Sequence, residues 1–206
     1  MMANDDDVLN GVSGRPLQLL SRWLSDAASA GVDEPRTFTL ATASLDGTPH
    51  ARTVLAVGVD DASVRFTTSR PSVKTADLAA NPLAAGVFFW PALMRQVTLH
   101  GQAVELPPDE ARAAYADRSP NLRALAWVYE DLGGGSPGAA VDPDDVRAAF
   151  TRELDRDRPE PPPSWTAYAL RPHRVEVWWM PGDAGVATRA RFDLAGGEWT
   201  RRFVLP

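Results

Sequence analysis

The sequence predicts a mostly β protein, an antiparallel barrel or strongly bent sheet with helices packed outside it. Several short segments alternate polar and apolar residues, as strands with one buried face do. The pair Asp46-Gly47 separates two of these segments and is typical of a hairpin turn. Segments with a helical period interrupt the strands. Hairpins with interspersed helices favour this architecture over a parallel sheet.

The elements follow in a simple order. The segment 15–31 carries, on one helical face, Leu17, Leu20 and Leu24. Ser72 suits the N-cap of a short helix that Asn81-Pro82 stops. Strands are expected at 36–59 (two, around the turn), 62–69, 84–90, 95–106, 165–172, 174–179, 186–194 and 198–206, and further helices at 107–119, 121–132 and 146–157.

The chain of 206 residues suits one domain. Residues 1–14 are polar and contain glycine, which predicts a disordered tail. A proline-rich linker covers residues 158–165, but the strands after it are too few to bury a core alone. Residues 15–206 are therefore predicted to form a single domain.

Composition excludes several classes of function. The net charge of −6 and pI near 5.1 argue against a general nucleic-acid or anionic-membrane binder. Without cysteine there is no disulfide, thiolate metal site or thiol nucleophile, and His50, His100 and His173 lack ligand spacing, so no metal is expected. The N-terminus lacks the order of a signal peptide, and the longest apolar stretch, 83–94, is shorter than the ~18 residues of a membrane span. A cytoplasmic protein is predicted.

Basic side chains occur in or beside the predicted strands. Arg52, Arg189 and Arg191 lie within strands, and Lys74 follows Ser72 at the start of a helix. A guanidinium binds phosphate through two parallel hydrogen bonds, and a helix start offers free N–H groups. These residues therefore form a candidate anion site. The residues alone favour the other interpretation, solvated faces of edge strands.

Other residues have two interpretations each. Gln96 heads a strand, where its carboxamide suits the edge of a heteroaromatic ring or equally a solvent-facing position. Trp178 and Trp179 point to opposite faces, so both are core or one stacks on a ligand or partner subunit. Tyr115 and Arg118, three apart on a helix, reach one ligand or form a surface pair.

The order of these pieces resembles the pyridoxamine 5'-phosphate oxidase family. The most specific segments are "SVKTADLAANP", residues 72–82, and "FFWPALMRQV", residues 88–97, and the resemblance continues through "WTAYALRPHRVEVWW" to the closing "RFVLP". It extends from about residue 16 to residue 206, nearly the whole chain.

The resemblance implies a split β-barrel homodimer with two FMN sites at the subunit interface. Members of the family pass a hydride from substrate to flavin, and O2 reoxidises the flavin to give hydrogen peroxide. By position, Arg52 and Lys74 match residues that hold the FMN phosphate, and Gln96 matches a glutamine that contacts the isoalloxazine. Together with Ser72 at the helix start, the expected cofactor contacts are Arg52, Val54, Leu55, Thr67, Thr68, Ser72, Lys74, Gln96, Trp178 and Arg189.

The chain also departs from the family. On the cofactor side, Val73 replaces an arginine, and Asp131-Leu132 replaces a Gln-Ser pair. On the substrate side, the positions of a lysine, a serine and a late Arg-x-His pair hold Val57, Leu122, Gly185 and Ala187. Losing three or four phosphate contacts at about 1.5–3 kcal/mol each would cripple binding of a phosphorylated vitamer. The expected substrate contacts are Arg118, Tyr115, Val57, Leu122 and Ala187.

Three hypotheses follow. The first is an FMN-dependent oxidase or dehydrogenase that takes a hydride from a small ring-containing compound, as relatives in phenazine biosynthesis do, with O2 as the second substrate. The second is a pyridoxine/pyridoxamine 5'-phosphate oxidase with rearranged phosphate contacts, from Arg191 or His173. The third is a non-catalytic split-barrel protein that binds flavin, deazaflavin or haem, for which His100 is the only hint.

Overall fold

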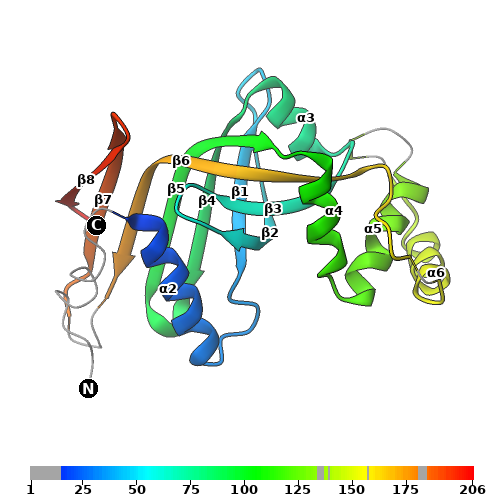
Figure 1. Ribbon diagram of the computed structural model, residues 1–206, viewed down its shortest axis with the longest axis horizontal. Helices are drawn as coiled ribbons and strands as arrows, with labels where there is room; N and C mark the ends of the chain where they lie inside the picture. The colour runs from blue at the N-terminus through cyan, green and yellow to red at the C-terminus, as the bar shows by residue number, and fades with distance from the viewer. Residues whose placement is uncertain (1–14, 134–136, 139, 157, 181–184) are drawn as a thin grey trace.

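The computed structural model describes residues 15–133, 137–138, 140–156, 158–180 and 185–206, so the predicted tail, residues 1–14, lies outside it. The helices, labelled as in Figure 1, are α2 (Pro16–Ser29), α3 (Val73–Ala80), α4 (Pro108–Ala116), α5 (Pro120–Leu132) and α6 (Pro143–Leu154), with a 3-10 turn, η1 (Pro91–Leu93). The strands are β1 (Thr37–Ala43), β2 (Pro49–Val59), β3 (Val64–Ser69), β4 (Leu83–Trp90), β5 (Arg95–Glu105), β6 (Trp165–Trp179), β7 (Thr188–Ala195) and β8 (Glu198–Val204).

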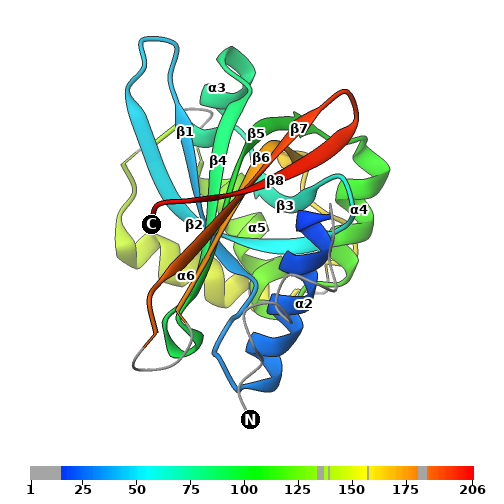
Figure 2. The same cartoon turned by 90° about the vertical axis from the view of Figure 1, so that its left-hand side faces the viewer.

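The strands form one sheet in the order β3-β2-β1-β4-β5-β6-β7-β8, and every neighbouring pair is antiparallel. An additional pairing of β3 with β6 closes six strands into a barrel. The hairpin of β7 and β8 extends beyond the barrel from β6 (Figures 1 and 2). The predicted class, a mostly β split barrel with peripheral helices, is confirmed in the described residues.

One strand differs from the prediction. The sequence indicated two strands, 165–172 and 174–179, whereas the structure has the single strand β6. Pro172 stands opposite Gly101, where the register between β5 and β6 shifts. A Cβ at Gly101 would lie 2.1 Å from the carbonyl oxygen of Arg171, so only glycine allows this approach of the two backbones. The irregularity accommodates the proline without ending the strand.

The helix boundaries follow from their caps. Ser72 is the N-cap of α3 as predicted, and its hydroxyl accepts from the backbone N–H of Thr75. Helix α6 begins earlier than the predicted 146, because the Asp142 carboxylate accepts from the backbone N–H of Asp144 at 2.8 Å. None of the described helices is both long and apolar enough to cross a membrane.

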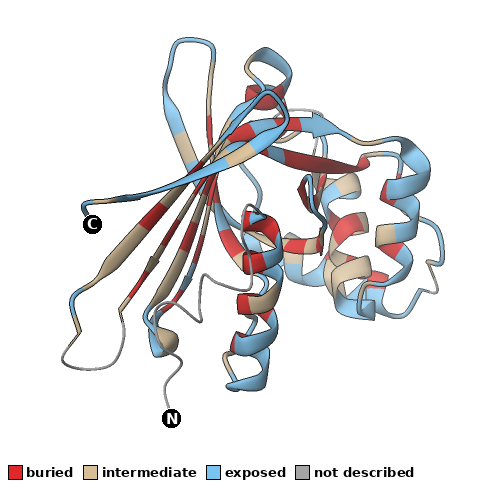
Figure 3. Cartoon of the chain, turned by 60° about the vertical axis from the view of Figure 1, so that its left-hand side comes forward, coloured by how far each residue is buried: buried red, intermediate tan, exposed pale blue. Residues whose placement is uncertain are grey.

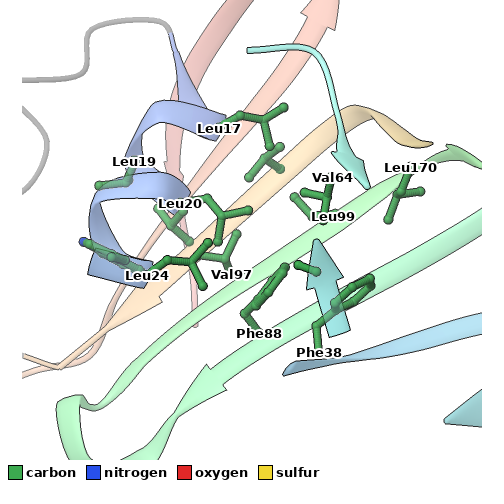
Figure 4. Packing of buried hydrophobic residues seen from close by; sticks show 14 of the residues in the cluster. Leu17, Leu19, Leu20, Leu24, Phe38, Val64, Phe88, Val97, Leu99 and Leu170 are labelled. Atoms are coloured by element: carbon green, nitrogen blue, oxygen red, sulfur yellow. The ribbon is translucent and has the colours of Figure 1, made fainter. Parts of the chain in front are cut away.

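Helix α2 packs its apolar face against the barrel. Alternate residues of the strands are buried, as the red bands in Figure 3 show. Figure 4 shows Leu20 and Leu24 of α2 beside Val97 of β5, in the same buried cluster as Phe88 of β4 and Leu170 of β6. Arg95 fastens the helix at one end, because its guanidinium pairs with Asp26 at 2.7 Å and lies over the ring of Trp23. This is the structural role of the arginine that precedes Gln96.

Helices α4, α5 and α6 lie on the opposite side from α2, beside β3 and the start of β6 (Figure 1). A second apolar cluster joins α4 and α5 to β6, with Tyr115 and Trp165 in edge-to-face contact. The boundary between this helical layer and the barrel holds the candidate site.

Candidate functional site

A cavity of about 680 Å³ lies where β2 and β3 meet α3, α5 and α6. It has the volume of a site for a cofactor or a small ligand. The predicted site residues that line it are Arg52, Val54, Leu55, Thr67, Thr68, Ser72, Lys74, Arg118 and Leu122. The fold therefore gathers these nine positions, which range over some 70 residues of sequence, in one place.

Lys74, the only lysine in the chain, lines the cavity together with Arg52. We call the part of the cavity at these two residues its basic end. Its ammonium donates to Thr68 Oγ1 at 2.8 Å and to Ser72 Oγ at 3.4 Å. It pairs with no carboxylate in the described part of the chain. Burial, and after it the charge of Arg52, lowers the pKa of Lys74. A half-buried ammonium with a cation as its neighbour is stabilised by a bound anion.

Arg52, on β2, is the second cation at this end. Its Nη1 donates to the carbonyl oxygen of Leu40 at 3.2 Å and to Thr42 Oγ1 at 2.8 Å. Burial lowers its pKa, and the charge of Asp77 opposes the shift. Since Asp77 is 3.9 Å from Arg52 Nη2, it compensates only part of the positive charge. Two cations with one partial counter-charge form a site that fits a phosphate.

Arg118, two residues after the end of α4, adds a third cation to the lining of the cavity. Its guanidinium lies 4.8 Å from the centre of the Trp165 ring, and Nη1 donates to Thr67 Oγ1 at 2.8 Å. Burial lowers its pKa. It forms no ion pair with a described carboxylate, and its Nε is buried without a hydrogen-bond partner in the described residues. A half-buried guanidinium with an unpartnered Nε can bind an anionic or carbonyl group of a ligand.

Two serines in the lining of the cavity have unused hydrogen-bonding groups. The hydroxyls of Ser69 and Ser164 line the cavity and are buried without a partner among the described residues. Buried polar groups without a partner are rare in native proteins. They therefore fit a polar ligand in the cavity.

The far wall of the cavity is apolar. It comes from one face of α5 and from the segment up to α6, and consists of Leu122, Leu125, Val128, Leu132, Val141 and Val146. Of these wall residues, the sequence predicted only Leu122 as a ligand contact. The spacing of about three residues in α5 was the available signal, but it does not distinguish a core face from a cavity wall.

The remaining residues that were predicted to contact flavin lie elsewhere in the chain. Gln96, Trp178 and Arg189 stand in register across β5, β6 and β7, so they share one face of the sheet. We call these three residues the flavin row. Arg189 pairs with Glu176, and Gln96 donates to Thr98 at 3.3 Å. Trp178 is half-buried, whereas Trp179 on the other face is core.

The flavin row and the cavity are at opposite ends of β6. Trp165, which lines the cavity, begins this strand of 15 residues, and Trp178 stands one residue before its end. At about 3.3 Å per residue the strand is about 45 Å long. The strand bends, but Figure 1 shows it crossing the whole molecule. One subunit therefore does not bring the two groups together.

The other predicted positions do not line the cavity. Tyr115, on α4, is fully buried, and its hydroxyl donates to the carbonyl oxygen of Arg158 at 3.2 Å. Val57 lies at the register shift between β2 and β3, and Ala187 precedes β7. Of the departures from the family, Val73 is half-buried beside Gly138, Gly185 is half-buried before β7, and Asp131 is exposed on α5.

Comparisons with known proteins agree with this geometry. A model of the family "Pyridoxamine 5'-phosphate oxidase" matches residues 24–179. A pyridoxine/pyridoxamine 5'-phosphate oxidase of Salinibacter ruber is 36% identical over 204 residues, covering 95% of this chain and 91% of that protein. One of Cupriavidus pinatubonensis is 38% identical over 167 residues, covering 81% and 77%.

Two solved structures are similar over nearly the whole chain. PhzG from Burkholderia lata, in complex with tetrahydrophenazine-1-carboxylic acid, has a TM-score of 0.82 at 29% identity and covers 94% of this chain and 93% of its own. A pyridoxamine 5'-phosphate oxidase-related, FMN-binding protein from Nostoc punctiforme has a TM-score of 0.74 at 22% identity and covers 91% and 95%. The second likeness concerns the fold alone.

Proposed function

Because this chain belongs to the pyridoxamine 5'-phosphate oxidase family, we propose that it is an FMN-dependent oxidase of a small, ring-containing compound. The observation that carries the proposal is the cavity, which is basic at one end and apolar at the other. In the described residues, two of its three half-buried cations, Lys74 and Arg118, pair with no carboxylate.

FMN fits the basic end. Arg52 and Lys74 would hold its phosphate, and Ser72, which caps α3, would lie beside them. Val54 and Leu55 line the cavity next to Arg52, where they would support the flavin. When bound, FMN would supply a hydride acceptor that O2 reoxidises with release of hydrogen peroxide.

The second half of the flavin site would come from a second copy of the chain. The flavin row is about a strand length from the cavity in the same subunit, so it can contact the flavin only across a dimer interface. A two-fold dimer would then contain two equivalent sites, each with a cavity from one copy and a row from the other. The half-buried indole of Trp178 is available for this contact.

Mixed dimers test this arrangement. At an FMN concentration near the wild-type dissociation constant, Lys74→Met and Trp178→Ala should each lose most flavin-dependent turnover in their own homodimers. A heterodimer of the two variants has one site with both changes and one site with neither. We expect co-expressed, tandem-tagged heterodimers to recover about half of the wild-type activity, because one of their two sites is intact. No recovery, or a monomeric wild-type protein by analytical ultracentrifugation, would refute the shared site.

The substrate would occupy the space between the flavin and helix α5. The leucines and valines of that wall exclude water and suit a flat apolar ring. Arg118, whose Nε has no partner in the described residues, would hold an anionic or carbonyl group on the ring. The likeness to PhzG, solved with a reduced phenazine carboxylic acid, supports this substrate class.

The names of the relatives from Salinibacter and Cupriavidus favour a second candidate, a pyridoxine/pyridoxamine 5'-phosphate oxidase. Val57, Leu122 and Ala187 replace its expected phosphate contacts, and only Leu122 lines the cavity. Arg191 and Arg174 share Asp193 on the outer sheet face, and a phosphate ligand would have to compete with that carboxylate.

One experiment decides between the candidates. The purified protein is loaded with FMN and mixed anaerobically with tetrahydrophenazine-1-carboxylic acid, pyridoxine 5'-phosphate or pyridoxamine 5'-phosphate. We expect flavin bleaching with the first compound and hydrogen peroxide when O2 is admitted. Bleaching with the vitamers alone would establish the second candidate. A protein that binds FMN but is bleached by none of the three would be a binding protein or an oxidase of another ring.

A further inference from the structure

Arg52 is held from behind by a hydrogen-bonded chain that joins three elements. Thr42, its partner in this chain, lies on β1 and donates to Asp77 Oδ2 on α3 at 2.6 Å. His50 Nδ1, on β2, is 2.9 Å from the same carboxylate oxygen. We call the four residues Arg52, Thr42, Asp77 and His50 the Asp77 network. In register, Thr42 stands directly opposite His50, and Leu40 opposite Arg52.

The network determines which way the Thr42 hydroxyl points. Burial opposes ionisation of Asp77, but hydrogen bonds from Thr42 and His50 and the charges of His50 and Arg52 outweigh it and lower its pKa. An ionised carboxylate only accepts hydrogen bonds. Thr42 must therefore give its single proton to Asp77, and its lone pair must face Arg52.

This polarity leaves one edge of the guanidinium for a ligand. Both protons of Arg52 Nη1 are used, one by the Leu40 carbonyl oxygen and one by Thr42. Neither Nε nor Nη2 of Arg52 hydrogen-bonds to a described residue, and Arg52 lines the cavity. Two N–H groups on the free edge of a fixed guanidinium match two oxygens of a phosphate.

The charge of Asp77 acts against the same ligand. Its carboxylate repels a phosphate dianion, so removing the charge and removing the hydrogen bond have opposite effects on affinity. Thr42 carries no charge and is buried, with 4% of its surface exposed. A change at Thr42 therefore isolates the positioning effect, which a change at Asp77 does not.

We propose that Thr42 and Asp77 are positioning residues that present the free edge of Arg52 to the phosphate of the flavin cofactor. The proposal rests on the proposed function, because it requires FMN at the basic end of the cavity. It adds that discrimination between phosphorylated and unphosphorylated flavin depends on a hydroxyl and a carboxylate that do not contact the flavin.

The test compares two ligands that differ only in the phosphate. Dissociation constants for FMN and riboflavin are measured by quenching of flavin fluorescence with the full-length protein stripped of flavin. Wild type is expected to bind FMN at least about tenfold more tightly than riboflavin, given two cations at the phosphate. Equal binding of the two flavins, or binding of neither, refutes the proposed function before any variant is made.

Thr42→Val is the decisive variant, because it keeps the shape of the side chain and the charge of Asp77 but removes the hydroxyl. We expect FMN affinity to fall about tenfold and riboflavin affinity to change less than about twofold. Thr42→Ser keeps the hydroxyl and should keep the wild-type ratio. Thr39→Val, an exposed change on the same strand, is the matched control and should also keep it.

The ratio of the two constants separates positioning from general damage. A loosened protein loses affinity for both flavins, and its ratio stays constant. An unchanged ratio in Thr42→Val would therefore overturn the proposal, whether the two affinities stay or fall together. If this variant does not fold, Thr42→Ala removes the same hydroxyl and is judged by the same ratio.

Discussion

Replacing Lys74 by methionine tests the phosphate site most directly. The side chain keeps its length and its apolar stem but loses the ammonium. In the flavin-free protein, burial and the charge of Arg52 disfavour the charged ammonium. Its hydrogen bonds go to two hydroxyl oxygens, at 2.8 and 3.4 Å. The loss of charge is therefore expected to leave the flavin-free protein at least as stable, as measured by thermal melting.

The effect on FMN is expected to be large and in the other direction. An ammonium has three N–H donors, and Thr68 and Ser72 accept two of them. The third can point to a phosphate oxygen. A charge-assisted hydrogen bond contributes about 1.5–3 kcal/mol, which corresponds to about 10- to 150-fold in the dissociation constant. Riboflavin affinity should change little.

The assay is a fluorescence titration with FMN, and Arg112→Met is its control. Arg112 is exposed on α4 outside the cavity, so the variant makes the same change in net charge elsewhere. Because Lys74 is the only lysine, an amine reagent can modify one ε-amino group besides the α-amino terminus. Peptide mass spectrometry should show that FMN protects Lys74.

Two results would refute the reasoning. FMN affinity within about twofold of wild type would mean that Lys74 does not contact the phosphate, since one lost charge-assisted bond exceeds that change. Equal labelling of Lys74 with and without saturating FMN would lead to the same conclusion. An equal loss in the Arg112→Met control would instead assign the effect to net charge.

Three further predictions concern pH and the fold. The pKa of Lys74 is lowered in the free protein, so its ammonium loses its proton below the ordinary pKa of 10.5. FMN affinity should therefore fall as pH rises through that lowered pKa. An FMN affinity that stays constant up to the ordinary pKa of lysine would contradict this. Gly101→Ala would place a Cβ 2.1 Å from a carbonyl oxygen of β6, so urea unfolding should show a loss of about 3 kcal/mol or more. Leu20→Ala, at a fully buried position of α2, should cost about 2–5 kcal/mol in the same assay, and a loss under about 1 kcal/mol would mean that α2 is not part of the core.

Local signals accounted for most of the elements. The Asp46-Gly47 hairpin, the Ser72 cap and the stop at Asn81 depend on a few neighbouring residues, and each is found where the sequence predicts it. The single β6 was missed because a proline normally ends a strand. Its accommodation depends on Gly101, some 70 positions away in the chain.

The candidate site was predictable in residue type but not in arrangement. The family resemblance predicted Arg52 and Lys74 as phosphate contacts, and both line the cavity. Ser69 and Ser164 were not chosen, because an isolated serine in a sequence has no pattern. Their buried, unpartnered hydroxyls become visible only when β3 and the start of β6 are paired.

By itself the sequence determined the succession of strands and helices, the hairpin and the caps, since these depend on short-range spacing and side-chain chemistry. The expectation that Arg52 and Lys74 contact a phosphate came from the family resemblance. Only the tertiary structure decided that β3 closes the barrel by pairing with β6, and that Thr42 links Arg52 to Asp77 through two hydrogen bonds. It also decided that the flavin row lies a strand length from the cavity. These are contacts and distances between residues far apart in the chain, and they exist only once the path of the backbone is set.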